Sequence, residues 1–280
     1  NNPRLMEIDK AQLKELLTNY GKIDVMFFDG PAEGLKEYAW QLQPELVVTR
    51  GQMKTPEQRL PDAPIPGPWE ACFTMGTDWQ YKPTNDPHKS GTQIINMLIE
   101  TRAKGGNLLL NVGPKPDGEI QIEQEALLRE VALWNLVNGE AVHAVRPWDV
   151  IKEDGIWFTQ AKSGDAVYAF VQTGKNWPYG TRKKVVIKGL EKTDQTKISV
   201  LGYGSKVVEY RKNFDAGVRV NSVEEGLEVS AVNGLRLYTN NQWPNPVVLK
   251  IENVRSTRAK STTSSNQSAK GETQEIDGLQ

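Results

Sequence analysis

The chain has 280 residues, 34 Lys and Arg against 35 Asp and Glu, and 38% hydrophobic residues, which is typical of a folded protein of up to two domains. Its balanced charge lacks the basic excess of nucleic-acid-binding or membrane-surface proteins, and no apolar run approaches the roughly 20 residues that span a bilayer. Because Cys72 is the single cysteine, an internal disulfide and a thiolate zinc site are both excluded. The two isolated histidines suggest no metal cluster, so we expect no metal and no cofactor.

The first 50 residues predict a helix, a strand, a short helix and a second strand. Apolar residues at helical spacing predict a helix from Leu5 to Tyr20. Ile23 to Phe28 is an apolar run that closes on Asp29 and Gly30, as expected of a parallel strand that is covered on both faces. A short helix over 38–43 and a buried strand over 46–48 follow.

The next hundred residues continue this alternation. A loop rich in Pro and Gly, 51–68, leads to an apolar run over 71–75, and Ser90 can cap a helix that ends near 104–106. Asn107 to Val112 predicts a third buried strand, and Ile122, Leu127, Val131 and Trp134 mark another amphipathic helix. Alternating helices and strands with polar residues at strand ends indicate a partial (β/α)8-type barrel of about half the usual eight units.

After Trp148 the pattern changes to short alternating runs separated by Gly, Asn and Asp turns, which predicts an antiparallel β-sandwich. We therefore expect a barrel domain over 1–148, a sandwich domain with its own core over 149–254, and a disordered, Ser- and Thr-rich tail over 255–280. The expected strands are Ile156–Gln160, Ala166–Val171, Lys184–Ile187, Lys197–Leu201, Lys206–Tyr210, Val218–Val220, Leu227–Ala231, Leu235–Tyr238 and Val247–Ile251.

Two carboxyl groups stand where a barrel places its chemistry. Asp29 follows a buried strand and precedes a glycine, although an Asp that caps a turn would look the same. Glu70 stands beside Trp69, and an indole next to a carboxyl group raises its pKa and suits it to donate a proton. A buried ion pair of Glu70 with Arg50 or Arg59 is the alternative. A nucleophilic carboxylate and an acid are together what glycoside hydrolysis requires.

The sequence around these residues resembles the α-L-fucosidases of glycoside hydrolase family 29. The order and spacing of the motifs match over roughly residues 10 to 150. The segments that carry the resemblance are Tyr20–Gly30, Thr55–Gln58, Pro68–Cys72 with Trp79–Tyr81, Lys104–Pro114 with Pro116–Gly118, and Asn138–Val142.

The resemblance implies a retaining exo-glycosidase that removes terminal α-L-fucose through a covalent fucosyl-enzyme intermediate. Asp29 would be the nucleophile and Glu70 the acid/base. The implied substrate-binding residues are Phe27, Arg50, Trp69, Trp79 and Tyr81. Trp79 and Tyr81 match an aromatic pair near the sugar, but hydrophobic filling under the barrel loops would explain them equally well. Asn107, Asn111 and Gly113 would build a strand and its turn.

The chain departs from the family in two ways. Phe27 stands where relatives commonly have Trp, and the early barrel segment whose histidines and glutamate hold the sugar has no counterpart. We therefore expect a fragment that acts with a complementing N-terminal chain or as a homo-oligomer. The alternative is an inactive carbohydrate-binding or scaffold remnant. The expected partner is a fucosylated oligosaccharide or glycoconjugate, and the expected location is periplasmic or secreted.

Overall fold

The computed structural model describes residues 3–49, 51–202, 215–234 and 245–258. Within residues 3–138, helices and short strands alternate as the sequence predicts, although the first two strands are shorter than expected. The elements are α1 (Pro3–Asn19), β1 (Val25–Met26), α2 (Leu35–Leu42), β2 (Val47–Val48), β3 (Glu70–Thr74), α3 (Gly91–Ala103), β4 (Asn107–Asn111) and α4 (Ile122–Asn138).

The strands of this part pair in parallel, β1 with β2 and β3 with β4. The loop between β2 and β3 runs alongside β3 in the same direction. Isolated bridges join Lys54 to Trp69 and Glu57 to Cys72 in parallel register. The backbone N–H of Gln58 donates to the Cys72 carbonyl at 2.8 Å, and that of Cys72 donates to the Pro56 carbonyl at 3.0 Å. Paired segments that run in the same direction have their carboxyl ends on the same side. In (β/α) barrels this is the side where catalytic residues lie.

Helix α3 begins as predicted at Ser90. The Ser90 side chain accepts from the Gln93 backbone N–H, and the Gln93 side chain accepts from the Ser90 N–H, which completes a capping box. On the sheet below the helix, Trp69, Ala71 and Phe73 are buried together with Met97 of α3. Since successive strand residues face opposite sides, Glu70, Cys72 and Thr74 point to the other face of β3.

The second half is a β-sandwich, as predicted. One sheet has the order β10-β11-β8 and the other the order β5-β6-β7-β12-β9. The strands are β5 (Val145–Glu153), β6 (Ile156–Ala161), β7 (Ala166–Val171), β8 (Arg182–Lys188), β9 (Leu190–Val200), β10 (Arg219–Val223), β11 (Gly226–Val232) and β12 (Val247–Ser256), and two 3-10 turns, Gly139–Ala141 and Gly174–Asn176, complete the elements.

Some expectations fall elsewhere. The strands expected over 206–210 and 235–238 lie outside the described residues, as does most of the expected 255–280 tail. Strand β5, which the sequence did not predict, spans both sides of the expected 148/149 boundary. Pro147 and the polar residues around it hide this strand from a search for alternating apolar residues.

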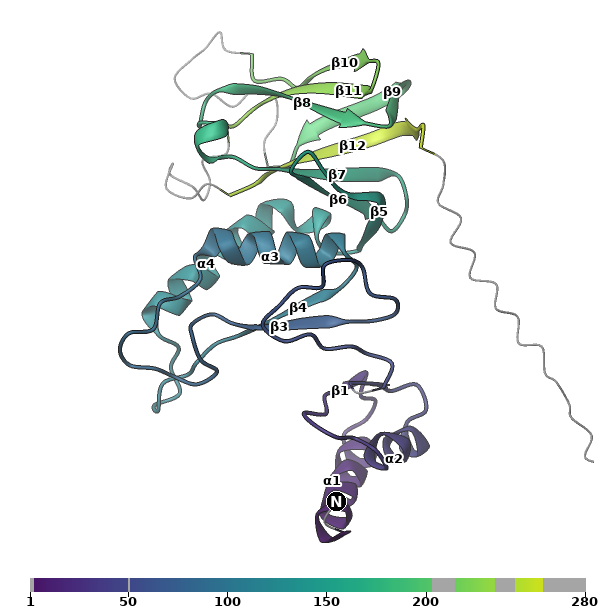
Figure 1. Ribbon diagram of the computed structural model, residues 1–280, viewed down its shortest axis with the longest axis vertical. Coiled ribbons are helices and arrows are strands. Elements are labelled where there is room, and N and C mark those ends of the chain that lie inside the picture. Colours follow the sequence, from purple (N-terminus) through teal and green to yellow (C-terminus); the bar gives the residue numbers. More distant parts are fainter. Residues whose placement is uncertain (1–2, 50, 203–214, 235–244, 259–280) are drawn as a thin grey trace, which may run out of the picture.

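The helices α3 and α4 form a layer between the β3–β4 pair and the five-stranded sheet (Figure 1). The expectation that the sandwich has a separate core is therefore wrong, because one buried cluster joins Ile95, Ile99 and Trp134 of the helices to both sheets. The Trp134 indole stacks on Phe170 with ring centroids 6.4 Å apart, and its N–H donates to the Pro246 carbonyl at 3.0 Å.

Helix α4 is less apolar on its buried face than its sequence suggests. Ile122 is 75% exposed, whereas Gln124, Glu130 and Asn138 are buried beside Trp134. The apolar spacing therefore predicted the helix but not all of its buried residues. None of the described helices has the length and apolar character that a membrane crossing requires.

Candidate active site

A cavity of about 280 Å³ lies beyond the end of β1 and beside the middle of β3 and β4. Two carboxylates face it from different segments, Asp29 after β1 and Glu57 from the loop that precedes β3 and pairs with it. The side chains that line it are those of Phe27, Asp29, Thr55, Glu57, Cys72, Trp79 and Leu109. Apolar side chains and two carboxylates thus line one cavity.

Asp29 is presented by a short segment that Thr49 holds in place. The hydroxyl of the fully buried Thr49 donates to the Phe28 carbonyl at 3.0 Å and accepts from the Phe28 N–H at 2.5 Å. Gly30 follows with φ of 125°, a value that side chains disfavour, so the chain can turn away directly after Asp29. These contacts fix the backbone on both sides of the carboxylate.

Glu57 owes its position to the bridge that pairs it with Cys72. Its neighbour Gln58 adopts φ of 54° and donates through its side-chain amide to the Thr74 hydroxyl at 3.2 Å. The predicted motif Thr55–Gln58 therefore has a structural cause: it holds Glu57 at the cavity.

Glu70 is not among the side chains that line the cavity. It begins β3, at the amino end of the strand, and burial raises its pKa as the sequence suggested. The expected reason is wrong, however, because the Trp69 indole lies on the opposite face of the sheet, in the core under α3. Carboxylates surround the Cys72 thiol: burial raises its pKa, and the nearby charges of Glu57, Glu70 and Asp29 raise it further.

The predicted sugar-binding residues divide into three groups. Phe27 and Trp79 line the cavity and are 45% and 38% exposed. Trp69 is 2% exposed in the core, so its predicted contact with substrate is wrong. Tyr81 lines a neighbouring cavity of about 550 Å³ with His88 and Lys115, and Arg50 lies outside the described residues.

The motif at the end of β4 positions Trp79, a role that the sequence did not reveal. The Asn111 side chain donates to the Trp79 carbonyl at 2.8 Å. A Cβ on Gly113 would lie 2.9 Å from the backbone of Gln80, so only glycine lets this loop approach so closely. Thr55, Cys72 and Leu109 are further cavity residues that sequence reasoning missed, although all three lie within the motifs that carry the resemblance.

No group of three or more His, Cys, Asp or Glu side chains that could hold a metal ion occurs in the part of the chain that the structure describes. The cavity itself offers the carboxyl groups of Asp29 and Glu57 beside parallel strands. A pair of carboxyl groups in one cavity is what a (β/α)-barrel glycoside hydrolase requires.

The comparisons relate the first half of the chain to one family. Residues 4–140 match the family model described as alpha-L-fucosidase, so this segment is similar to the α-L-fucosidases. It is similar to the tissue alpha-L-fucosidase of Mus musculus, with 38% identity over 158 residues that make up 54% of this chain and 32% of that protein. The chain spans about 30% of the length of the curated relatives it matches best.

The fold is shared with solved α-L-fucosidases. Isoenzyme 1 from Paenibacillus thiaminolyticus aligns with a TM-score of 0.70 and 24% identity over 91% of this chain and 63% of that chain. A GH29 enzyme from Bacteroides thetaiotaomicron, described as a trapped covalent intermediate in complex with 2-fluoro-fucosyl fluoride, aligns with a TM-score of 0.67 and 22% identity over 90% of this chain and 61% of that chain. These alignments cover both the barrel strands and the sandwich.

Proposed function

We propose that the chain supplies the catalytic cavity of a retaining exo-α-L-fucosidase, with Asp29 as nucleophile and Glu57 as acid/base. The observation that carries the proposal is that these two carboxylates, and not Glu70, line one cavity with Phe27 and Trp79. Relatives that match residues 4–140 are α-L-fucosidases, and a similar structure is described as a covalent intermediate. Both findings support hydrolysis of terminal α-L-fucose.

In the first step, an oxygen of Asp29 attacks the anomeric carbon of the sugar while the bond to the leaving oxygen breaks. Protonated Glu57 gives its proton to that oxygen, and the product is a β-linked ester on Asp29. In the second step, ionised Glu57 takes a proton from water, the water oxygen attacks the anomeric carbon, and Asp29 is released. The configuration of the substrate is thereby retained.

The apolar side chains that line the cavity have a separate role. Phe27, Trp79 and Leu109 offer carbon surface to the sugar, and fucose carries a methyl group and an apolar ring face that such surface can cover. Phe27 preserves an apolar platform without an indole N–H. Tyr81 and the cavity that it lines would then bind the leaving group, which is the part of the glycan released from the fucose.

The experiment compares Glu57→Ala with Glu70→Ala on an aryl α-L-fucoside with an activated phenol. If Glu57 is the acid/base, Glu57→Ala should spare the first step, accumulate the ester and respond to azide by forming the α-fucosyl azide. With a poor leaving group, its kcat should fall about 10²- to 10⁴-fold. Azide rescue of Glu70→Ala instead would overturn the assignment and restore Glu70 as the acid/base.

Asp29→Gly is the matched test of the nucleophile. Loss of the Asp29 carboxylate removes the step that forms the covalent ester, so turnover should fall by at least about 1,000-fold. Azide can then attack from the vacated face and should form the β-fucosyl azide, the opposite configuration to the product of the Glu57 variant. Near-normal turnover in a folded Asp29→Gly protein would sink the proposal.

We also propose that the open parallel sheet is completed by another chain or by a second copy. In the described residues, β1 pairs only with β2 and β4 pairs only with β3, and Val25 and Leu109 are 50% and 40% exposed. Open strand edges and exposed apolar surface favour association. Light scattering of the active species measures this: the mass of a single 31.3 kDa chain with full activity would contradict it.

The substrate also bears on the location. Fucosylated glycans lie mostly outside the cytoplasm, so we propose a periplasmic or secreted protein. Cell fractionation with detection of the chain tests this, and recovery in the cytoplasmic fraction alone would contradict it. An inactive glycan-binding remnant is the alternative, and it requires that the unaltered chain and both the Asp29 and Glu57 variants bind the glycan without turning it over.

A further inference from the structure

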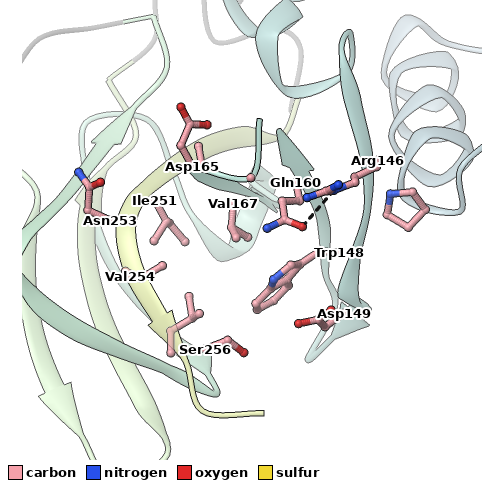
Figure 2. Close-up of a pocket in the computed structure, with 14 residues that line it drawn as sticks. Arg146, Trp148, Asp149, Gln160, Asp165, Val167, Ile251, Asn253, Val254 and Ser256 are labelled. Atoms are coloured by element: carbon pink, nitrogen blue, oxygen red, sulfur yellow. Dashed lines mark hydrogen bonds between the residues drawn. The ribbon is translucent and has the colours of Figure 1, made fainter. Parts of the chain in front are cut away.

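A second cavity, of about 670 Å³, lies in the sandwich at one end of the five-stranded sheet (Figure 2). Its volume falls within the range of about 300–1,000 Å³ that small-molecule sites occupy. It shares no lining residue with the Asp29 cavity. The residues that matter for its chemistry are Arg146, Trp148, Asp149, Gln160, Asp165 and Asn253.

Two irregularities of the sheet meet at this cavity. The register of β5 against β6 shifts between Pro147 and Lys152, and that of β12 against β9 shifts between Glu252 and Val254. Asn253, within the second shift, has φ of 55°. Bulges redirect side chains and are enriched beside functional sites, so the distorted strands give this end of the sheet its hollow shape.

The floor of the cavity is apolar and rigid. Trp148 is only 5% exposed, and its indole is tilted against Phe158 with ring centroids 5.0 Å apart. Figure 2 shows the indole directed into the space between the strands. Ile251 and Val167 add buried carbon surface to the lining.

The rim carries both hydrogen-bond acceptors and donors. The Arg146 guanidinium donates to the Gln160 side-chain oxygen at 3.4 Å, which leaves the amide nitrogen of Gln160 as a donor. Asp149 and Asp165 are exposed carboxylates. The Ser163 hydroxyl donates to Asp165 at 2.5 Å and holds the pKa of that carboxyl below its usual range, so it remains an acceptor.

We propose that this cavity is a binding site for a neutral oligosaccharide, separate from the hydrolytic cavity. Sugar hydroxyls both donate and accept, so they match carboxylates and amides on one rim, while the ring face of a sugar covers the indole floor. The two carboxylates outnumber the one guanidinium among the lining residues, which disfavours an anionic ligand. The site would hold a glycan chain at the sandwich, and its existence does not depend on the proposed hydrolysis.

The experiment titrates 2′-fucosyllactose into the full chain that carries Asp29→Ala, which prevents turnover, and follows ¹⁵N-resolved amide and indole signals. The proposal expects saturable shifts at the Trp148 indole and the Gln160 and Asn253 side-chain amides. Asp149→Ala combined with Gln160→Ala should weaken this binding by about tenfold or more, because the variant loses a charged hydrogen-bond acceptor and an amide donor. Both residues reach the surface, which lets the variant fold.

The matched control is Glu224→Ala, which removes an exposed carboxylate from the β10–β11 turn of the other sheet and should leave binding unchanged. The negatively charged sialyllactose should bind at least about tenfold more weakly than the neutral sugar. Shifts confined to residues around the Asp29 cavity would overturn the proposal. Equal binding of sialyllactose, or unchanged affinity in the double variant, would overturn it as well.

Discussion

Thr49, directly after β2, holds the segment that carries Asp29, the proposed nucleophile. Its hydroxyl makes two hydrogen bonds with the Phe28 backbone, one residue before Asp29, and it is buried completely. Thr49 is not among the residues that line the cavity, so we assign it a positioning role that acts through the backbone before Asp29. An attacking carboxylate must be held close to its reactive geometry, which gives this contact its importance.

Thr49→Val should lower kcat of the active species by about 10- to 100-fold, because a displacement of about 1 Å at a reacting group has effects of this size. Thr49→Ser keeps the hydroxyl and should restore most of the activity. The control is Thr159→Val, which removes an equally buried hydroxyl that donates to the Ala141 carbonyl at 2.8 Å in the other half of the molecule. If both valine variants lose the same stability and the same activity, the positioning role is contradicted.

At the scale of the element, the loop that carries Trp79 depends on the end of β4. Asn111 holds the Trp79 carbonyl, and the missing side chain of Gly113 makes room for the Gln80 backbone. The sequence indicated these residues as strand and turn formers. Their second role, positioning the loop that carries Trp79, follows only from the tertiary structure, which places that loop beside them.

Gly113→Ala should displace this loop, since a Cβ 2.9 Å from backbone atoms cannot be accommodated without movement. We expect a higher KM for the aryl fucoside together with a destabilisation of about 1–3 kcal/mol, as for other overpacked sites. Gly139→Ala is the control, because a Cβ there would meet only His143 at an ordinary 3.4 Å. Unchanged kinetics in Gly113→Ala would contradict this account.

Helix α4 contains a buried acid whose state links stability to pH. Glu130 is 4% exposed and accepts from the Asn245 side chain at 3.0 Å. Burial raises its pKa, and the hydrogen bonds from Asn245 and Thr92 oppose the rise without cancelling it. The folded protein therefore binds this proton more tightly than the unfolded chain does.

The stabilisation from this proton is complete below the unfolded-state pKa of about 4.3 and is lost as pH rises through the higher folded-state pKa. Glu130→Gln cannot ionise, so its Tm relative to that of the unaltered chain should rise between about pH 4 and pH 7. Thermal unfolding at several pH values measures this difference. A difference between Glu130→Gln and the unaltered chain that stays constant over this pH range would contradict the assignment.

At the scale of the whole molecule, the α3–α4 layer joins the barrel sheet to the sandwich. Helix α3 contacts β4 on one side and β5 and β6 on the other. Lys104, at the end of α3, is buried; its ammonium donates to the Pro61 carbonyl at 2.6 Å and lies 5.4 Å from the Trp157 ring centroid. The two halves therefore share a core instead of meeting at a narrow seam.

An expressed segment 145–258 should consequently lack a cooperative unfolding transition, because removal of α3 and α4 exposes the face of the sheet around Phe170. A segment 68–258, which keeps β3, β4 and both helices, should unfold cooperatively. Calorimetry of the two segments makes the comparison. A sharp transition in 145–258 would show that the sandwich folds by itself after all.

The sequence by itself determined the local structure and the family. The apolar run before Asp29, the Ser90 cap and the alternating strands of the second half predict elements that the structure contains, because these signals depend on near neighbours in the chain. The five ordered motifs indicated an α-L-fucosidase, which the family match confirms. Asp29, Phe27 and Trp79 were found because strand ends and motif positions identify them.

Only the tertiary structure decided which second acid lines the cavity with Asp29 and which aromatic residues reach it. Trp69 and Glu70 are adjacent in the chain, yet strand alternation sends them to opposite faces, and the packing of α3 on Trp69 determines which face is the core. Glu57 reaches the cavity through its pairing with Cys72, a contact between residues distant in sequence. Neither fact has a local signal, since both arise from the way in which distant segments pack together.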